Sequence, residues 1–203
     1  WIVTAHAGVA KYDGRKVHFL KEGPQGLSTN TVVAALEDRR GRIWIATAGG
    51  GLNVYDKDTN SVRVFRHREG DPYSLNSDTF SYKNHGNQVL LEDRAGGLWC
   101  GTLRGVSRLE SDDRRGVFFT PVPFADGVPR TVYALLEDRR GKIWVGTDRG
   151  LSRLDPSKGV IETWTVGSLG ELEGKAIFCL LEDRDGNLWA GGDSGLHGLL
   201  ASG

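Results

Sequence analysis

One motif recurs four times along this chain and restricts the folds that it can adopt. The copies read LEDRRGRIWIAT, LEDRAGGLWCGT, LEDRRGKIWVGT and LEDRDGNLWAGG, and they begin at Leu36, Leu91, Leu136 and Leu181. The first four residues, WIVT, match the end of the motif and form a fifth, partial copy. Self-similarity of this kind predicts stacked structural repeats, in which each unit buries its apolar face against its neighbours.

The spacing and the local pattern predict strands within each repeat. The motif tryptophans are separated by steps of 43, 55, 45 and 45 residues, and a period near 45 with β-type content is typical of propeller blades. In the copy around Trp144, apolar residues alternate at period 2 and predict four short strands, at 131–137, 143–147, 151–155 and 159–166. We therefore expect an all-β fold, a β-propeller made of four-stranded antiparallel blades with essentially no helix.

The repeats also set the expected domain organisation. Residues 1–203 form one propeller domain or a fragment of one, with blade modules at about 1–22, 31–67, 87–120, 131–166 and 175–200. Three modules are complete, whereas the first lacks its inner strand and the last its outer strand. We expect part of a larger, seven-bladed ring, with a closed five-bladed ring as the alternative. The chain contains no Met and begins with Trp, which indicates a processed chain or a piece of a longer protein.

Composition argues against several classes of function. The 26 basic and 26 acidic residues balance to zero net charge, so no overall positive field attracts nucleic acid. No apolar run reaches the roughly 18 residues of a membrane-spanning helix. The five histidines show no metal-ligand spacing, and no nucleophile triad, phosphate loop or dinucleotide fingerprint occurs. We predict neither a metal nor a cofactor, and no catalytic residue.

The acidic pair in each motif invites a catalytic interpretation that its repetition disfavours. Paired carboxylates serve as acid and nucleophile in glycoside hydrolysis, but neighbouring strand residues point to opposite faces, and a catalytic pair is needed once. We expect the Asp to cap the following turn, and the motif Gly, such as Gly141, to supply the positive φ that closes it. The motif tryptophans are expected to pack between neighbouring blades, and both cysteines to be small buried apolar residues.

The string ED-R-x-G-x-[IL]-W-x-G-T, followed by G-[LV]-x-x-[LY]-[DE], resembles the two-component regulator propeller repeat over nearly the whole chain. In that family such repeats build the extracytoplasmic sensor region of membrane-bound bacterial histidine kinases, often hybrid ones. Members from gut bacteria sense carbohydrate fragments. The resemblance implies a non-enzymatic, ligand-sensing propeller in the periplasm, with any kinase domain elsewhere in the full-length protein.

Ligand-binding residues are expected where the copies differ, because residues that close and pack a blade must recur. The long step places about ten extra residues between Tyr73 and Gln88, just before an innermost strand. Connections from outer to next inner strand share a face with the turns between second and third strands, around the mouth of the central channel. The predicted ligand-binding residues on this face are Phe80, Tyr82, Lys83, Asn84, His85, Asn87, Arg104, Asp148, Arg149, Asp193 and Ser194.

Three functions remain open because propellers host all of them. The favoured one is a sensor that binds a small polar molecule such as an oligosaccharide. The second is a scaffold that binds another protein on its blade edges. The third is a lyase or glycosidase with His85 paired to Asp148 or Asp193 as acid and base. Expected partners are a small-molecule or carbohydrate ligand and other blades or domains of the same polypeptide, with a homodimer left open and no nucleic acid.

Overall fold

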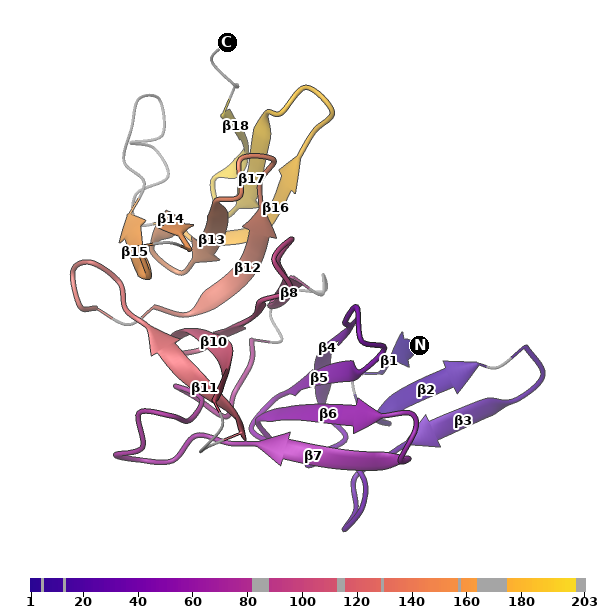
Figure 1. Cartoon of the computed structure of the whole chain (residues 1–203). Coiled ribbons are helices and arrows are strands. Elements are labelled where there is room, and N and C mark those ends of the chain that lie inside the picture. Colours follow the sequence, from indigo (N-terminus) through magenta and orange to yellow (C-terminus); the bar gives the residue numbers. More distant parts are fainter. Residues whose placement is uncertain are drawn as a thin grey trace.

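The computed structural model describes residues 1–4, 6–12, 14–81, 88–112, 116–128, 130–156, 158–163 and 175–199. Within these ranges all regular secondary structure is β-strand, in five antiparallel sheets. Each sheet is one repeat, and its strands are hydrogen-bonded in sequence order (Figure 1). The predicted all-β fold of four-stranded antiparallel blades is confirmed.

The strand bounds follow the repeats. The first sheet holds β1 (Ile2–Val3), β2 (Val9–Tyr12) and β3 (Val17–Leu20), and the second β4 (Val32–Glu37), β5 (Ile43–Thr47), β6 (Leu52–Asp56) and β7 (Ser61–Phe65). The third holds β8 (Leu90–Glu92), β9 (Leu98–Thr102), β10 (Gly105–Asp112) and β11 (Gly116–Val122). The fourth holds β12 (Val132–Glu137), β13 (Ile143–Thr147), β14 (Gly150–Asp155) and β15 (Val160–Thr163), and the fifth β16 (Ile177–Glu182), β17 (Leu188–Gly192) and β18 (Gly195–Leu199).

The sheets follow one another along an open arc. The inner strands β4, β8, β12 and β16 contact one another in that order, and β1 of the first sheet contacts β4, as neighbouring blades of a propeller do. In Figure 1 the β2–β3 hairpin and the β16–β18 sheet lie at opposite ends of the arc, apart from each other. The number of blades in a closed ring therefore stays a prediction.

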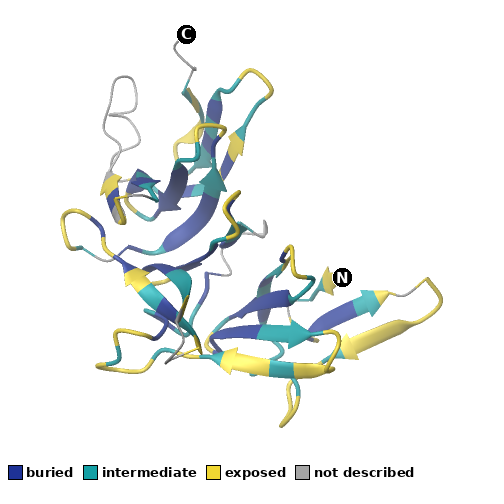
Figure 2. Cartoon of the chain, in the orientation of Figure 1, coloured by how far each residue is buried: buried dark blue, intermediate teal, exposed yellow. Residues whose placement is uncertain are grey.

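The hydrophobic core lies between the sheets. One cluster joins Trp44 to residues of the third sheet, a second joins Trp99 to the fourth, and a third joins Trp144 to the fifth. The second strands β5, β9 and β13 are buried over their whole length (Figure 2). The predicted packing of motif tryptophans between blades is confirmed for Trp44, Trp99 and Trp144, since each of these rings fills the gap to the next blade.

The motif Asp organises the turn between the first two strands, as predicted. Asp138 Oδ1 accepts hydrogen bonds from the backbone N–H groups of Arg140 and Lys142, each at 2.9 Å, and Gly141 closes the turn with a φ of 73°. Asp138 Oδ2 also accepts a hydrogen bond from Trp144 Nε1 at 2.8 Å, a contact the sequence did not predict. The same indole bond recurs from Trp44, Trp99 and Trp189 to their own motif Asp.

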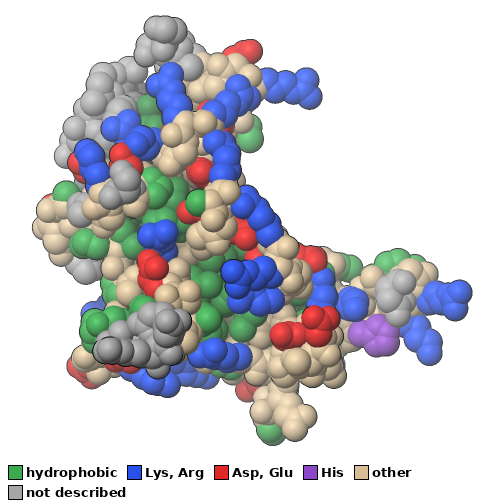
Figure 3. Space-filling model, viewed as in Figure 1, with side chains coloured by type: hydrophobic (Ala, Val, Ile, Leu, Met, Phe, Trp, Pro, Cys, Tyr) green, Lys and Arg blue, Asp and Glu red, His purple; other side chains and the backbone are tan. Residues whose placement is uncertain are grey.

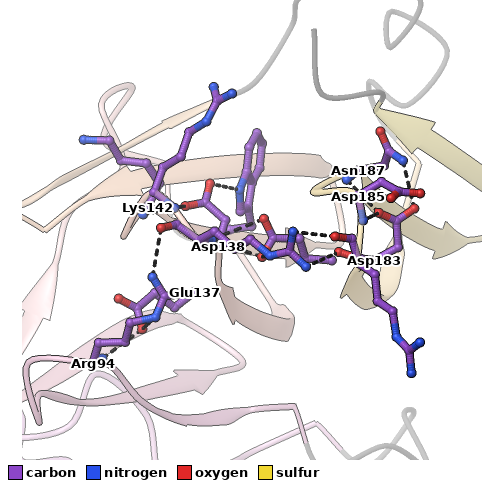
Figure 4. A network of polar contacts seen from close by, with 12 residues as sticks. Arg94, Glu137, Asp138, Lys142, Asp183, Asp185 and Asn187 are labelled. Atoms are coloured by element: carbon purple, nitrogen blue, oxygen red, sulfur yellow. Dashed lines mark hydrogen bonds and ion pairs between the residues drawn. The ribbon is translucent and has the colours of Figure 1, made fainter. Parts of the chain in front are cut away.

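The motif Glu and the Arg after the Asp join neighbouring blades. The backbone N–H of Arg94 donates to Glu137 Oε2 at 2.8 Å, and its guanidinium Nη1 donates to the carbonyl oxygen of Arg139 at 3.0 Å (Figure 4). We call this pair of contacts the interblade clasp. It recurs from Arg39 to the third sheet and from Arg139 to the fifth. The repeated carboxylates are therefore structural, as the sequence analysis favoured.

Candidate functional site

Two sets of connections meet at one edge of the sheets. The backbone N–H of Asp148, between β13 and β14, donates to the carbonyl oxygen of Thr131, just before β12, at 3.0 Å. Asp193 makes the same contact with Ala176, also at 3.0 Å. We call this edge the mouth face, and the edge that carries the Asp-capped turns the turn face. The prediction that these two kinds of connection share a face is confirmed for the residues that the structure describes.

At the mouth end of the inner strands, one position differs in every repeat. The register of β12 against β13 shifts between Val132 and Ala134, which leaves Tyr133 as a bulged residue, and β4 and β16 shift in the same place. Bulges re-aim side chains and are frequent beside functional sites. The four equivalent residues, each three positions before the motif Leu, are Val33, Gln88, Tyr133 and Phe178. We call them the mouth positions.

Two of the mouth positions form an aromatic pair across neighbouring blades. The ring centroids of Tyr133 and Phe178 lie 5.2 Å apart with their planes at 63°. Burial raises the pKa of Tyr133, and the carboxylates of Asp148 and Asp193 raise it further. The phenol therefore stays protonated at neutral pH, beside two carboxylates that can accept hydrogen bonds from ligand hydroxyl groups.

A third mouth position connects three blades. Gln88 Nε2 donates to the carbonyl oxygen of Leu180 at 2.7 Å, and Gln88 Oε1 accepts from the N–H of Leu180 at 3.0 Å. The backbone carbonyl of Gln88 also accepts from the N–H of Leu135 at 2.7 Å. Gln88 thus links β12 and β16 of the two following blades and fixes the wall beside Tyr133.

Several predicted residues lie together near this wall. Asp148 is half-buried, and its Oδ1 accepts from the N–H of Thr131 at 3.0 Å, while Arg149 and Asp193 are exposed on adjacent turns. Ser194 is exposed on the same turn as Asp193, and its hydroxyl is 2.9 Å from His197 Nε2. Asp148 and Asp193 lie on successive turns of the mouth face, and both carboxylates raise the pKa of Tyr133.

Other predicted residues lie elsewhere. Phe80 is completely buried in the core between the second and third sheets, so it presents no face to a ligand, and its proposed stacking role is wrong. Arg104 is exposed on the mouth face but lines a different pocket, at the junction of the second and third sheets. The predicted residues Tyr82, Lys83, Asn84, His85 and Asn87 lie outside the described residues.

Most of the extra residues of the third repeat lie between Thr79 and the inner strand β8. The segments 26–31 and 74–79 share a pattern, GLSTNT and SLNSDT. Both are fixed to their own sheet in the same way, by Ser28 N–H to Asn53 Oδ1 at 2.8 Å and Asn76 N–H to Ser107 Oγ at 3.2 Å. Most of the extra residues therefore follow Thr79, and β8 has three residues where β4, β12 and β16 have six. Among the described residues, the inner strand of the third sheet is therefore shorter than its counterparts.

The sequence analysis missed the mouth positions, although a signal was present. Aligning the four motifs and comparing the third residue before each Leu gives four chemically different residues at one structural position. Among the described residues, no group of three or more His, Cys, Asp or Glu side chains could hold a metal ion. In the same ranges, no helix has the length and hydropathy to cross a membrane.

Comparison with known proteins points to one repeat family. The sequence profile of the two component regulator propeller matches residues 26–49, 127–149 and 171–194. A similar solved structure is the extracellular domain assigned to the hybrid two-component system BT3049 of B. thetaiotaomicron, with a TM-score of 0.73, 25% identity, and coverage of 97% of this chain and 26% of that one. No curated protein sequence matches the chain.

Two further structures share the fold. PorZ, a surface component of the type-IX secretion system of Porphyromonas gingivalis, has a TM-score of 0.66 and 17% identity, over 97% of this chain and 30% of its own. The extracellular domain assigned to the hybrid two-component system BT4673 of B. thetaiotaomicron has a TM-score of 0.64 and 22% identity, over 94% of this chain and 27% of its own. The chain spans about a quarter to a third of the length of these proteins.

Proposed function

We propose that this chain, three segments of which match the two component regulator propeller model, is a ligand-sensing β-propeller of a bacterial two-component signalling protein. Two of its structural neighbours are extracellular domains of hybrid two-component systems, which supports a signal-input role. The same likeness supports an extracytoplasmic location, on the periplasmic side of a membrane-anchored protein. In this role the domain binds its ligand without transforming it.

The observation that carries this proposal is the contrast between the two faces. On the turn face every complete motif repeats the same Asp cap and Trp bond. On the mouth face the equivalent inner-strand positions are Val33, Gln88, Tyr133 and Phe178. A small asymmetric ligand needs different groups that converge on one point, and a strict repeat does not supply them.

The groups near Tyr133 favour a small polar ligand with several hydroxyl groups, such as an oligosaccharide. The Asp148 and Asp193 carboxylates accept hydrogen bonds, the Arg149 guanidinium donates them, and Phe178, which is half-buried against the buried Tyr133 ring, offers an aromatic surface. All of these groups stand on β-strands or on the short turns that join them. A rigid scaffold of this kind holds a binding site with little loss of entropy on binding.

Isothermal titration calorimetry tests the proposal with a panel of di- to hexasaccharides. We expect at least one to bind, and Asp148→Asn together with Asp193→Asn to weaken its binding by about tenfold or more, as loss of charged hydrogen-bond acceptors does. Arg140→Ala on the turn face is the matched control and should leave the affinity unchanged. Loss of binding in the control, with the double variant unaffected, would contradict the assignment to the mouth face.

A further inference from the structure

A separate pocket opens on the mouth face where the second and third sheets meet. Its volume is about 340 Å³, within the range of small-molecule sites. One wall comes from residues 67–76 together with Arg104, and the other from residues 121–128. Tyr133, Asp148 and Asp193 are not among its lining residues, so this pocket is distinct from the site proposed above.

The first wall is fixed by Asn76, whose side chain is fully used in hydrogen bonds. Its Oδ1 accepts from the hydroxyls of Thr102 at 3.0 Å and Ser107 at 2.7 Å. Its Nδ2 donates to the carbonyl oxygens of Arg104 at 3.3 Å and Val106 at 3.2 Å. Asn76 therefore binds the connecting segment to the third sheet and holds the backbone of Arg104 in place.

The second wall is apolar and equally well held. Pro121, Val122, Pro123, Phe124 and Val128 line it. Backbone hydrogen bonds join Pro123 and Ala125 to Ile161 of the fourth sheet, at 2.9 and 2.8 Å. The pocket thus lies between two walls that are already formed without a ligand, which lowers the entropic cost of binding.

Three polar side chains of the first wall keep hydrogen-bonding capacity for a ligand. The Arg104 guanidinium has no hydrogen-bond or ion-pair partner among the described residues, although its backbone is held on both sides. Asp71 Oδ1 accepts a hydrogen bond from the N–H of Tyr73 at 2.9 Å, which leaves Oδ2 available to a ligand. His67 Nδ1 is hydrogen-bonded to the carbonyl oxygen of Leu75 at 2.7 Å, which leaves Nε2 available to a ligand. The wall therefore presents one cation, one anion and one imidazole nitrogen.

We propose that this pocket binds a free α-amino acid with an apolar side chain. The carboxylate of such a ligand pairs with the exposed Arg104 guanidinium and its ammonium group with the half-buried Asp71 carboxylate, so both charges of the ligand are matched. Its side chain lies against the proline, valine and phenylalanine wall and removes that apolar surface from water. A neutral sugar would leave this apolar wall unmatched, and a simple anion would leave Asp71 unpaired.

The second sheet does not offer the same wall. His67 and Asp71 belong to the segment RHREGDPY, residues 66–73, which leads into the third sheet. The segment that leads into the second sheet, KEGPQG at 21–26, is shorter and has no counterpart of these two residues. At the equivalent turn of the fourth sheet, Arg149 occupies the position of Arg104, and it is not among the residues that line this pocket. Arg149→Gln is therefore a matched control for Arg104→Gln.

Calorimetric titration of the 203-residue chain with L-phenylalanine and L-leucine tests this inference. We expect both to bind, and Arg104→Gln and Asp71→Asn each to weaken binding about tenfold or more, as loss of a charged partner does. Hydrocinnamate, which lacks the ammonium group, and phenethylamine, which lacks the carboxylate, should each bind more weakly than L-phenylalanine. Hydrocinnamate should be insensitive to Asp71→Asn, and phenethylamine to Arg104→Gln.

Two controls make the result decisive. Arg149→Gln should leave the affinity for L-phenylalanine unchanged, and the denaturant midpoints of all variants should match that of the unsubstituted chain. Absence of binding to both amino acids, or binding that Arg104→Gln and Asp71→Asn leave intact, would overturn the inference. Saccharide binding that responds to Asp148→Asn and Asp193→Asn is a separate readout, so failure here is distinguishable from failure of the sensor proposal.

Discussion

The fourth and fifth sheets carry the same motif in different surroundings. In both, the Trp indole donates to its motif Asp at 2.8 Å, so the capped turn belongs to the repeat itself. Burial differs: Trp144 is 7% exposed and packs against the fifth sheet, whereas Trp189 is only half-buried and Leu181 is 61% exposed. Local geometry is thus set within a repeat, and burial is set by the next one.

The surroundings also explain why one of the sequence predictions is wrong. Cys100 in β9 is buried as expected, but Cys179 in β16 is exposed, because no following sheet covers it among the described residues. Arg153 lies over the Trp144 ring with its guanidinium carbon 5.8 Å from the centroid, whereas the residue opposite Trp189 is Gly198. Identical motifs therefore predict identical turns, but not equal contributions to stability.

The largest predicted difference between the two sheets concerns their tryptophans. Trp144→Ala should lower the free energy of unfolding by about 3–5 kcal/mol, because it empties a contact between blades. Trp189→Ala should cost only about 1–2 kcal/mol, since much of that ring already meets water. Urea denaturation followed by circular dichroism measures both, and equal losses would show that the following sheet adds nothing to the packing.

The interblade clasp predicts a smaller difference between two arginines. Arg139 Nη1 and Nη2 donate to the carbonyl oxygens of Arg184 and Asp183 at 2.6 and 2.8 Å, whereas no clasp from the Arg184 side chain occurs among the described residues. Arg139→Ala should therefore cost about 1–2 kcal/mol, and Arg184→Ala no more than about 0.5 kcal/mol. The same denaturation experiment checks this pair, and a larger loss for Arg184→Ala would contradict the clasp.

The capped turn of the fifth sheet predicts a dependence of stability on acid. Hydrogen bonds from the Trp189 indole and the Asn187 amide lower the pKa of Asp183 to about 2, below the value of about 3.9 in an unfolded chain. The stabilisation by its ionised form is then complete above about pH 4 and is lost as the pH falls through about 2. Denaturation curves between these values should show a weaker pH dependence for Asp183→Asn than for the unsubstituted chain.

The smallest change in stability is expected at Arg140, a turn-face residue whose backbone, but not its side chain, takes part in the capped turn. Arg140 donates its N–H to Asp138 Oδ1 at 2.9 Å, and its side chain is exposed. Figure 3 shows Lys and Arg side chains, with Asp and Glu among them, along the arc of sheets. Arg140→Ala should change the free energy of unfolding by no more than about 0.5 kcal/mol. A loss comparable to that of Trp144→Ala would mean that side chains, and not the cap, hold this turn.

The repeated parts of the molecule were predictable from sequence because repetition identifies positions under one structural constraint. The strand order, the Asp138 cap, the Gly141 turn and the interblade packing of Trp144 all follow from four aligned motifs. The interblade clasp could not be predicted from the motifs. Glu137 accepts a hydrogen bond from a backbone N–H of the preceding blade, and a local sequence pattern does not show contacts between residues so far apart in the chain.

The candidate site was less predictable, because it depends on where single side chains point. Phe80 looked like part of an exposed polar loop but is completely buried in the core between the second and third sheets. Arg104 and Arg149 occupy equivalent turns, yet only Arg104 meets a pocket, since residues 66–73 build its other wall. Tyr133 was passed over because an aromatic residue inside a strand is ordinarily core; it is indeed buried, and only the register shift distinguishes its position.

Hydrogen–deuterium exchange with and without a saturating saccharide from the calorimetric panel shows where the ligand binds. We expect slower exchange on binding at the mouth ends of the fourth and fifth sheets, residues 131–135, 147–150, 176–180 and 192–195. The capped turns at 138–142 and 183–187 should exchange at the same rate with and without ligand. Protection confined to the capped turns, with the mouth ends unchanged, would contradict a ligand site on the mouth face.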